Sequence, residues 1–382
     1  MEGRPEPFHY HRQPLRSAHI VCYALSTLCV RLSYWIVAAA IPGLYPRRAS
    51  PMSGPCMRAG IAPFFVVGFP YEQEAEDVVP APEDEAKGFV SLSPVEDRFV
   101  VGEVKEIAEL NGVEPRRTYG YWYKAANVLG RGDHPAKDDE VVYLQFHGDG
   151  YSMETPQPSG YAAPSVCSGL FRHAPRTSRV LAPAYRYVAS LPFPPKNPFP
   201  AALLDALAAY HHLHNAGFRA EKVVLSGDSA GGHLAIALVH YLATGKLPEL
   251  PASGALLLVS PTSNFCIPFF TSESQYIARG LAGRLPADAG RTNAWISPAS
   301  RGLPQTKGLF AEFRRTLMVL GEAETQRDGM WTFRDRLIGD VGQEKVTYRE
   351  LLGVSHDVIS IPWADDDKDS AFRMVGEWLP SL

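Results

Sequence analysis

A five-residue turn with a serine at its centre constrains the fold of this chain more than any other segment. Residues 227–231 read Gly-Asp-Ser-Ala-Gly, with Ser229 in the middle. An apolar run, residues 222–226, precedes this turn, and a stretch with helical character, residues 235–242, follows it. Strand, sharp turn, serine and helix in this order are typical of a nucleophile elbow, which leaves the serine hydroxyl exposed. A glycine-rich turn whose serine only caps a helix would also satisfy so short a pattern.

A second motif precedes the serine by about 80 residues, which is the spacing expected of an oxyanion loop. The apolar run 141–146 reads as a buried strand and leads directly into the glycine-containing loop 147–151. Backbone N–H groups in such a loop stabilise the negative charge that develops on a carbonyl oxygen during acyl transfer, commonly by about 2.7–4 kcal/mol per donor. The N–H of Ala230, which follows the serine, would supply a further donor.

The base that takes the serine proton should lie downstream of Ser229. In chains built around a nucleophile elbow, the serine, the acid and the histidine follow one another in that order. The histidines after the serine are His233, His240 and His356. His233 and His240 fall on the helix that follows the elbow, whereas His356 lies in a loop after the strand-like run 345–348. The sequence therefore predicts His356 as the base.

The acid that orients the base should come from the loop after the apolar run 317–320. That loop, residues 321–328, contains three carboxylates, namely Glu322, Glu324 and Asp328. Position along the chain does not choose among them.

The motifs together give the chain a family resemblance. It resembles the hormone-sensitive-lipase-like branch of the α/β-hydrolases, and within that branch the fungal esterases of secondary metabolism. The resemblance covers about residues 85–382 and rests on five segments: 147–150, 181–186 followed by Pro195 and Pro200, 227–232, 321–328 and 353–357.

The resemblance implies a choice among the three acids. In the family the acid is the first carboxylate of an acid-x-x-Arg-Asp pattern, and Glu324 holds this position here, with Arg327 and Asp328 completing the pattern. Glu324 is therefore the expected acid, Asp328 the reserve and Glu322 a more distant third.

The oxyanion loop departs from the family at one position, because Asp149 stands where relatives usually carry a third glycine. The resemblance implies backbone donors from Asp149, Gly150 and Ala230. Aspartate tolerates a left-handed backbone better than most residues, but its carboxylate would oppose a developing oxyanion unless it is turned away or paired. The other motif residues are expected to support this geometry, His147 as a buried scaffold residue together with Gly148, Gly227 and Gly231.

The fold predicted from these patterns is an α/β-hydrolase fold. Strand-like runs alternate with helical patterns, which argues for a mostly parallel sheet covered by helices on both faces. A length of 382 residues with 46% hydrophobic residues allows one large catalytic domain, expected at residues 85–382. The predicted strands beyond 141–146 are 179–184, 223–227, 255–260, 317–321 and 346–351, and helices are predicted over 200–216 and after residues 365–367.

Composition argues against several classes of partner. The net charge of −4 and the absence of a basic cluster with interleaved aromatic residues disfavour nucleic acid. Five scattered cysteines indicate neither a disulfide framework nor a zinc site, and His211, His212 and His214 read as one face of a helix rather than as metal ligands. We expect a small ester as the partner and no cofactor or metal, and nothing in the sequence indicates an oligomeric state.

Residues 1–84 are expected to form an N-terminal apolar segment, a helical cap and a linker. The stretch 18–44 is apolar but contains Arg31, and a charge near the centre of a spanning helix costs about 2.5–3.5 kcal/mol. A signal anchor, a helix lying in the membrane interface and a cap over the active site remain as alternatives, and the resemblance implies the cap. Residues 72–87 read as an exposed linker. The predicted location is intracellular, either membrane-associated through residues 18–44 or cytosolic.

The function that these features predict is ester hydrolysis through an acyl-enzyme on Ser229, as in an esterase or deacetylase, with a small and fairly apolar substrate. His356 would act as general base and then acid, and Glu324 would orient its imidazole. Two alternatives use the same fold: an acyltransferase or cyclisation-promoting enzyme with the same triad, and a non-catalytic ligand receptor, a class that typically loses the histidine. Epoxide hydrolases and dehalogenases are disfavoured, because they usually need a carboxylate where Ser229 stands.

Overall fold

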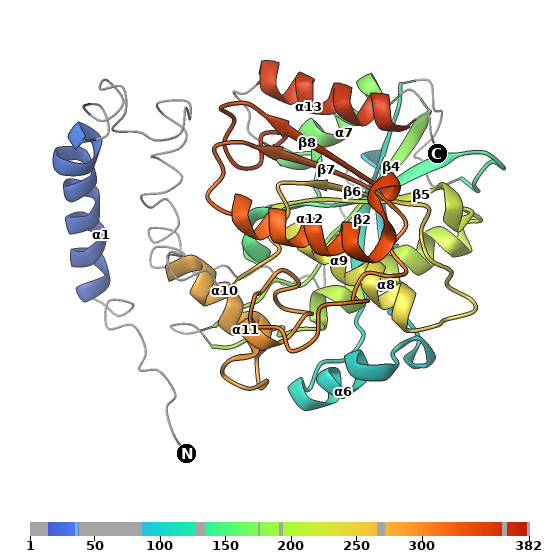
Figure 1. Cartoon of the computed structure of the whole chain (residues 1–382), viewed down its shortest axis with the longest axis horizontal. Coiled ribbons are helices and arrows are strands. Elements are labelled where there is room, and N and C mark those ends of the chain that lie inside the picture. The colour runs from blue at the N-terminus through green and yellow to red at the C-terminus, as the bar shows by residue number, and fades with distance from the viewer. Residues whose placement is uncertain are drawn as a thin grey trace.

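The fold is built on one eight-stranded sheet (Figure 1). It is seen in a computed structural model, which describes residues 14–34, 37, 86–126, 134–174, 176–190, 194–265, 272–360 and 365–379. The strands lie in the order β1-β2-β4-β3-β5-β6-β7-β8. Their bounds are β1 Phe89–Leu92, β2 Thr118–Lys124, β3 Val141–Phe146, β4 Thr177–Pro183, β5 Val223–Asp228, β6 Ala255–Val259, β7 Arg315–Gly321 and β8 Val346–Leu351.

The sheet is parallel from β4 through β8 and antiparallel at one edge, where β1 pairs with β2 and β2 pairs with β4. Parallel neighbours need crossover connections, and helices supply them between β3 and β8. The mostly parallel sheet predicted from the sequence is therefore confirmed. The strands β1 and β2 were not among the predicted ones.

Helices cover both faces of the sheet, with α7 and α13 on one face and α8, α9 and α12 on the other (Figure 1). Along β3 the side chains of Val142 and Leu144 enter the core on the α8–α9 side, and Val141 and Tyr143 enter the core on the opposite side. The helices that follow β1 are α6 Gly102–Asn111, α7 Ala162–His173, α8 Ala201–Asn215, α9 Ser229–Thr244, α10 Ser272–Ala282, α11 Ala289–Thr292, α12 Arg327–Val341 and α13 Asp365–Trp378.

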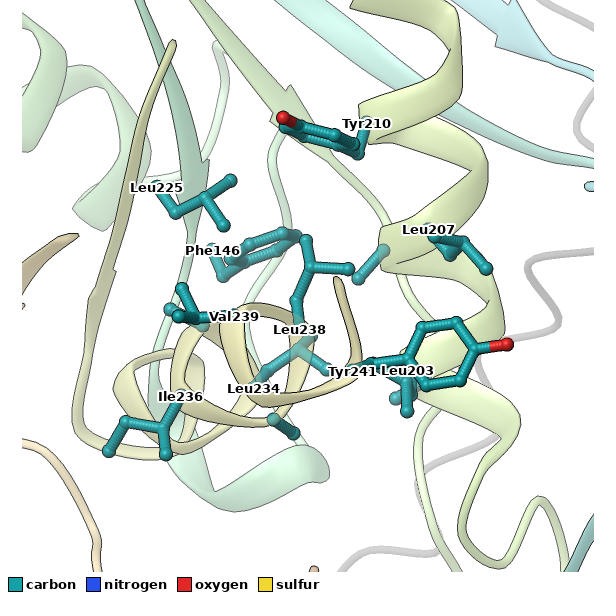
Figure 2. Packing of buried hydrophobic residues seen from close by; sticks show 14 of the residues in the cluster. Phe146, Leu203, Leu207, Tyr210, Leu225, Leu234, Ile236, Leu238, Val239 and Tyr241 are labelled. Carbon is teal, nitrogen blue, oxygen red and sulfur yellow. The ribbon is translucent and has the colours of Figure 1, made fainter. Parts of the chain in front are cut away.

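Helix α9 is the central helix of the larger core and begins at the serine of the elbow. Leu234 and Leu238 of α9 belong to the same buried cluster as Leu207 of α8 and Phe146 of β3 (Figure 2). All of these side chains are buried. A helix that is apolar nearly all round belongs in the interior, so the residues at its N-terminus rest on a tightly packed support.

Most predicted boundaries agree with the structure within two residues. The strands 141–146 and 346–351 have the predicted bounds. Helix α8 was predicted over residues 200–216 and covers Ala201–Asn215. The helix after the elbow begins at Ser229 rather than at residue 235. The last helix packs on the sheet as predicted, since Phe372, Val375 and other side chains of its inner face are buried.

At the N-terminus, helix α1 covers Leu15–Ser26 and continues into the π-helical segment Thr27–Arg31. Several of its apolar side chains are exposed, among them Leu15, Val21 and Leu25. Among the described residues, no helix combines the length and hydropathy that crossing a bilayer requires. Of the stretch 18–44, for which a cap over the active site was one alternative, the structure describes residues 18–34 and 37, and nearly all of the linker 72–87 lies outside the described residues.

Candidate active site

The predicted elbow lies at the junction of β5 and α9. Ser229 has a φ of 48°, a left-handed conformation that is rare for residues other than glycine. Strand and helix approach so closely that a Cβ atom on Gly231 would lie 2.1 Å from the carbonyl oxygen of Phe146. A Cβ atom on Gly227 would lie 2.3 Å from the carbonyl oxygen of Gly231. The glycines are therefore required by packing, and the strained serine is held at the carboxyl end of the strand.

Two loops bring a histidine and a glutamate to this serine. Nε2 of His356, in the loop after β8, lies 2.9 Å from the Ser229 Oγ atom. Nδ1 of the same imidazole lies 2.7 Å from Oε2 of Glu324, in the loop after β7. Because β5, β7 and β8 are parallel, their carboxyl ends meet at one edge of the sheet. The arrangement allows proton transfer from the hydroxyl to the imidazole.

The other downstream histidines lie on α9 and contact other groups. His233 Nδ1 lies 2.7 Å from the hydroxyl of Tyr151. The ring centroid of His240 lies 4.5 Å from that of Trp295. Burial lowers the pKa of both imidazoles to about 4, so both are neutral.

Glu324 is the acid that contacts the imidazole. Its side chain is buried, and its Oε1 accepts hydrogen bonds from Ser260 Oγ at 2.6 Å and from the Gly321 N–H at 2.7 Å. Glu322 instead accepts a hydrogen bond from the Gly353 N–H at 3.0 Å, and Asp328 lies in the first turn of α12. The hydrogen bonds to Oε1 leave Oε2 aimed at the imidazole.

The electrostatic surroundings make His356 a strong base. Burial alone would lower its pKa, but the hydrogen bond and the charge of Glu324, with smaller contributions from Asp357 and Asp149, raise the pKa of His356 to about 9. A high pKa favours acceptance of the hydroxyl proton, since the imidazolium that forms is stabilised by these carboxylates.

The loop after β3 has a left-handed backbone at three successive residues. Asp149, Gly150 and Tyr151 have φ values of 60°, 66° and 56°. Ala230 lies in the first turn of α9, where backbone N–H groups have no acceptor within the helix. Residues 149 and 150 thus lie in the loop after β3 and residue 230 in the first turn of α9, and their role as oxyanion donors stays a prediction.

The carboxylate of Asp149 is paired. Its Oδ2 accepts a hydrogen bond from the hydroxyl of Tyr161 at 3.2 Å. It still acts over a distance, because it contributes to the raised pKa of His356. Tyr161 was not recognised in the sequence, since it lies outside every motif and comes close only through the fold.

A buried layer supports the oxyanion loop from below. The ring of His147 stacks on Tyr185 with centroids 4.5 Å apart, and the Tyr185 hydroxyl donates a hydrogen bond to the carbonyl oxygen of His147 at 2.7 Å. Burial lowers the pKa of His147 to about 4, so this imidazole is neutral. Its burial and contacts are those of the scaffold residue that the sequence predicted.

Two further residues near the serine were missed in the sequence. Ser260 has a φ of 49° and bonds to the glutamate, and Thr262 Oγ1 lies 3.4 Å from the Ser229 Oγ atom. Both follow β6, the neighbour of β5. The signal that could have found them is their position just after a strand whose carboxyl end lies at the same edge of the sheet.

No metal cluster accompanies the site within the described ranges: no three His, Cys, Asp or Glu side chains there are arranged to hold an ion. His211, His212 and His214 lie on α8, as the helical reading predicted.

Comparison with known proteins identifies a family and several relatives. Residues 143–360 match the model of the α/β hydrolase fold family. An acetyl-hydrolase of Streptomyces hygroscopicus is 35% identical over 179 residues, which are 41% of this chain and 55% of that protein. The carboxylesterase/phospholipase LipF of Mycobacterium tuberculosis is 38% identical over 120 residues, 31% of this chain and 28% of that protein. The chain thus spans about half the length of the first relative and less of the second.

Solved structures of fungal esterases have the same fold. Carboxyl esterase 2 of Tuber melanosporum superposes with a TM-score of 0.55 at 19% identity and covers 80% of this chain and 93% of its own. An esterase of Rhizomucor miehei superposes with a TM-score of 0.54 at 16% identity, and the match covers 70% of this chain and 79% of the esterase chain. At these identities the likeness concerns the fold.

Proposed function

The chain belongs to the α/β-hydrolase fold family, and on that premise we propose that it is a serine hydrolase of carboxylic esters, working through an acyl-enzyme on Ser229. The single observation that carries this proposal is the contact of 2.9 Å between the serine hydroxyl and His356, whose other ring nitrogen faces Glu324. The names of relatives, an acetyl-hydrolase and a carboxylesterase/phospholipase, support the same class of reaction.

Acylation begins with the serine. Its Oγ attacks the carbonyl carbon of the ester while His356 Nε2 takes the hydroxyl proton, and Glu324 stabilises the imidazolium. The carbonyl oxygen becomes an oxyanion, and the N–H groups of Asp149, Gly150 and Ala230 are the donors proposed to bind it. The bond to the alcohol oxygen then breaks, and the imidazolium returns its proton to that oxygen.

Deacylation repeats these steps with water. The imidazole takes a proton from a water molecule, and the hydroxide attacks the acyl carbon. The same N–H groups bind the second oxyanion. Cleavage of the bond to Oγ releases the carboxylic acid and restores the serine, with its proton returned from His356.

We infer a small and fairly apolar ester as the substrate, and the name of the acetyl-hydrolase relative favours a short acyl group. A role in secondary metabolism stays a prediction from the resemblance. Transfer of the acyl group to an alcohol shares the acyl-enzyme with hydrolysis and differs only in the acceptor.

The proposal is tested by labelling and turnover. A fluorophosphonate should label the wild-type chain at Ser229, and p-nitrophenyl esters of increasing acyl length should be hydrolysed, the acetyl ester fastest. Ser229→Ala should lose the label and about 10⁴- to 10⁶-fold in kcat, with an unchanged circular dichroism spectrum. An alanine variant that kept wild-type turnover would show that Ser229 is not the nucleophile.

We also infer that the N-terminal helix rests on a membrane surface. The support is its exposed apolar side chains, which include Val21, Leu25 and Leu28. An interfacial helix binds by burying such side chains at the boundary of headgroups and acyl chains.

A further inference from the structure

Two buried aspartates flank the proposed catalytic pair in the chain. Asp228 immediately precedes Ser229, and Asp357 immediately follows His356. Their side chains are 1% and 5% exposed, respectively. Neither is needed for the steps described above, so their burial beside the site asks for a separate explanation.

Each aspartate uses one carboxyl oxygen for an ordinary hydrogen bond. Oδ1 of Asp228 accepts from Nε2 of Gln145 at 2.8 Å. Oδ2 of Asp357 accepts from the hydroxyl of Ser360 at 2.6 Å. The other two oxygens, Asp228 Oδ2 and Asp357 Oδ1, are buried and have no N–H or O–H donor among the described residues. The two carboxyl groups are hydrogen-bond neighbours of each other.

Two ionised carboxylates would not be stable in this arrangement. Both groups would be negatively charged acceptors, and they repel each other strongly in a buried site without water. A single proton converts the repulsion into a strong charge-assisted O–H···O⁻ hydrogen bond. Burial, and then the charge of Asp357, raise the pKa of Asp228 well above its ordinary value. Burial also raises the pKa of Asp357, although the neighbouring His356 opposes this.

We propose that Asp228 and Asp357 share one proton, and that this hydrogen bond ties the turn bearing the nucleophile to the loop bearing the base. Both aspartates are positioning residues, and the role rests on the proposed function of Ser229 and His356. The expected bearer of the proton is Asp228, because the ionised form of Asp357 is favoured beside His356.

The backbone around the pair makes such a link effective. Ser229 and Asp357 both have left-handed conformations, with φ values of 48° and 58°, which cost energy and persist only where the surroundings hold them. A Cβ atom on Gly148 would lie 2.5 Å from Asp228 Oδ2. The pair thus joins the elbow to the loop after β8 and, through Asp228, borders the oxyanion loop at Gly148.

Titratable groups face the pair from several elements. His356 and Glu324 act on Asp357, and Asp149 acts on Asp228. Asp357 also interacts with Glu154 and Tyr161, and Asp228 interacts with Tyr185. None of these groups that face the pair, apart from His356, carries a positive charge. The surroundings therefore favour retention of the shared proton at neutral pH.

The test replaces the shared proton by a permanent donor. In Asp228→Asn the amide oxygen can still accept from Gln145, and the NH₂ group can donate to Asp357 at any pH. Asp228→Ala has no donor, and a nucleophile displaced by about 1 Å can lose about 100-fold in rate. We expect asparagine to restore most of the kcat that alanine loses, with KM nearly unchanged in both variants.

The pH profile distinguishes a shared proton from mere packing. Wild-type kcat should fall at alkaline pH as the pair loses its proton, and Asp228→Asn should lack this fall. Asp205→Asn is the matched control, because Asp205, on α8, is also buried but pairs with Arg186. This control should lower the unfolding midpoint and leave the alkaline fall in place.

A readout without turnover separates this proposal from the proposed function. At neutral pH the infrared difference spectrum of wild type minus Asp228→Asn should contain the C=O stretch of a protonated carboxylic acid. Failure of the fluorophosphonate to label Ser229 would overturn the proposed function and leave the infrared test of the pair intact. The shared proton is wrong if this band is missing, if folded Asp228→Asn is as slow as Asp228→Ala, or if its alkaline fall persists.

Discussion

The side chain of Glu324 is oriented by one hydrogen bond from a residue far away in the sequence and one from a residue nearby. Oε1 of Glu324 is held by Ser260 and by the Gly321 N–H, which leaves Oε2 to the imidazole. A buried carboxylate in this setting has one productive orientation. The hydrogen bonds of Glu324 therefore set the orientation of the His356 ring, and this orientation brings Nε2 close to Ser229.

Substitution of the acids tests this reasoning directly. Glu324→Gln should lower kcat by as much as about 10⁴-fold, because the amide does not stabilise the imidazolium. Asp328→Asn should keep most of the activity and lower the free energy of unfolding by about 0.3–1 kcal/mol, because Asp328 lies at the positive end of α12. Steady-state kinetics and thermal melts of the two variants measure this, and the reverse ranking would assign the role to Asp328.

The raised pKa of His356 predicts how kcat/KM depends on pH below about pH 9. The imidazole must be neutral to accept the serine proton, and its pKa is raised to about 9. The value of kcat/KM should therefore rise about tenfold per unit of pH below that value and level off near it. Loss of the carboxylate in Glu324→Gln should move the rise to lower pH. A wild-type rise centred near the ordinary histidine pKa would contradict this prediction.

At the scale of elements, the oxyanion loop and helix α9 form one packed unit. The loop leaves β3 with three successive left-handed residues, Asp149–Tyr151, and Tyr151 reaches His233 of α9. This contact links the loop to the helix whose first turn contains Ala230. A change in the loop backbone should be felt in transition-state stabilisation rather than in substrate binding.

Asp149→Gly examines the unusual residue of this loop. Glycine adopts the observed φ of 60° without strain, and the variant removes a carboxylate near the developing oxyanion. We expect kcat for short p-nitrophenyl esters to rise by no more than about tenfold, with KM little changed.

Asp149→Asn is the matched control for charge. It should show a similar gain if the carboxylate is responsible, because the amide keeps the side-chain shape and a contact with Tyr161. A clear loss in both variants on every ester would mean that the side chain of Asp149, and not only its backbone, serves the reaction.

At the scale of the whole molecule, the parallel sheet decides which loops meet. The strands β5, β7 and β8 deliver Ser229, Glu324 and His356 to one edge, although 127 residues separate the serine from the histidine. Helices buried on both faces keep that edge rigid. The described sheet begins at residue 89, and the catalytic unit of residues 85–382 stays a prediction.

Removal of residues 1–84 tests the N-terminal segment. The remaining chain should unfold cooperatively, because the described sheet and the helices that cover it lie beyond residue 85. The full chain should sediment with vesicles of mixed neutral and anionic lipids, and the shortened chain should stay in the supernatant. If neither sediments but the shortened chain changes its preference for acyl length, the segment serves as a cap over the site.

The sequence by itself determined the features that are encoded locally. A turn of small residues between a strand and a helix, a glycine-containing loop after a strand and an ordered series of serine, acids and histidine were enough to predict the sheet, the elbow and the family. Local patterns suffice here because each element buries its own apolar side and each tight approach demands glycine. The catalytic roles of the residues stay predictions.

Only the tertiary structure decided how the acid is oriented and what surrounds it. The family resemblance already favoured Glu324 over Glu322 and Asp328, but the hydrogen bonds from Ser260 and Gly321 that direct its carboxylate appear only in the fold. The Tyr161 contact of Asp149 joins residues 12 positions apart, and the buried pair of Asp228 and Asp357 joins residues that are distant in sequence. Such contacts arise from how strand ends converge and how buried charges must be satisfied, and neither is written in any short segment of the chain.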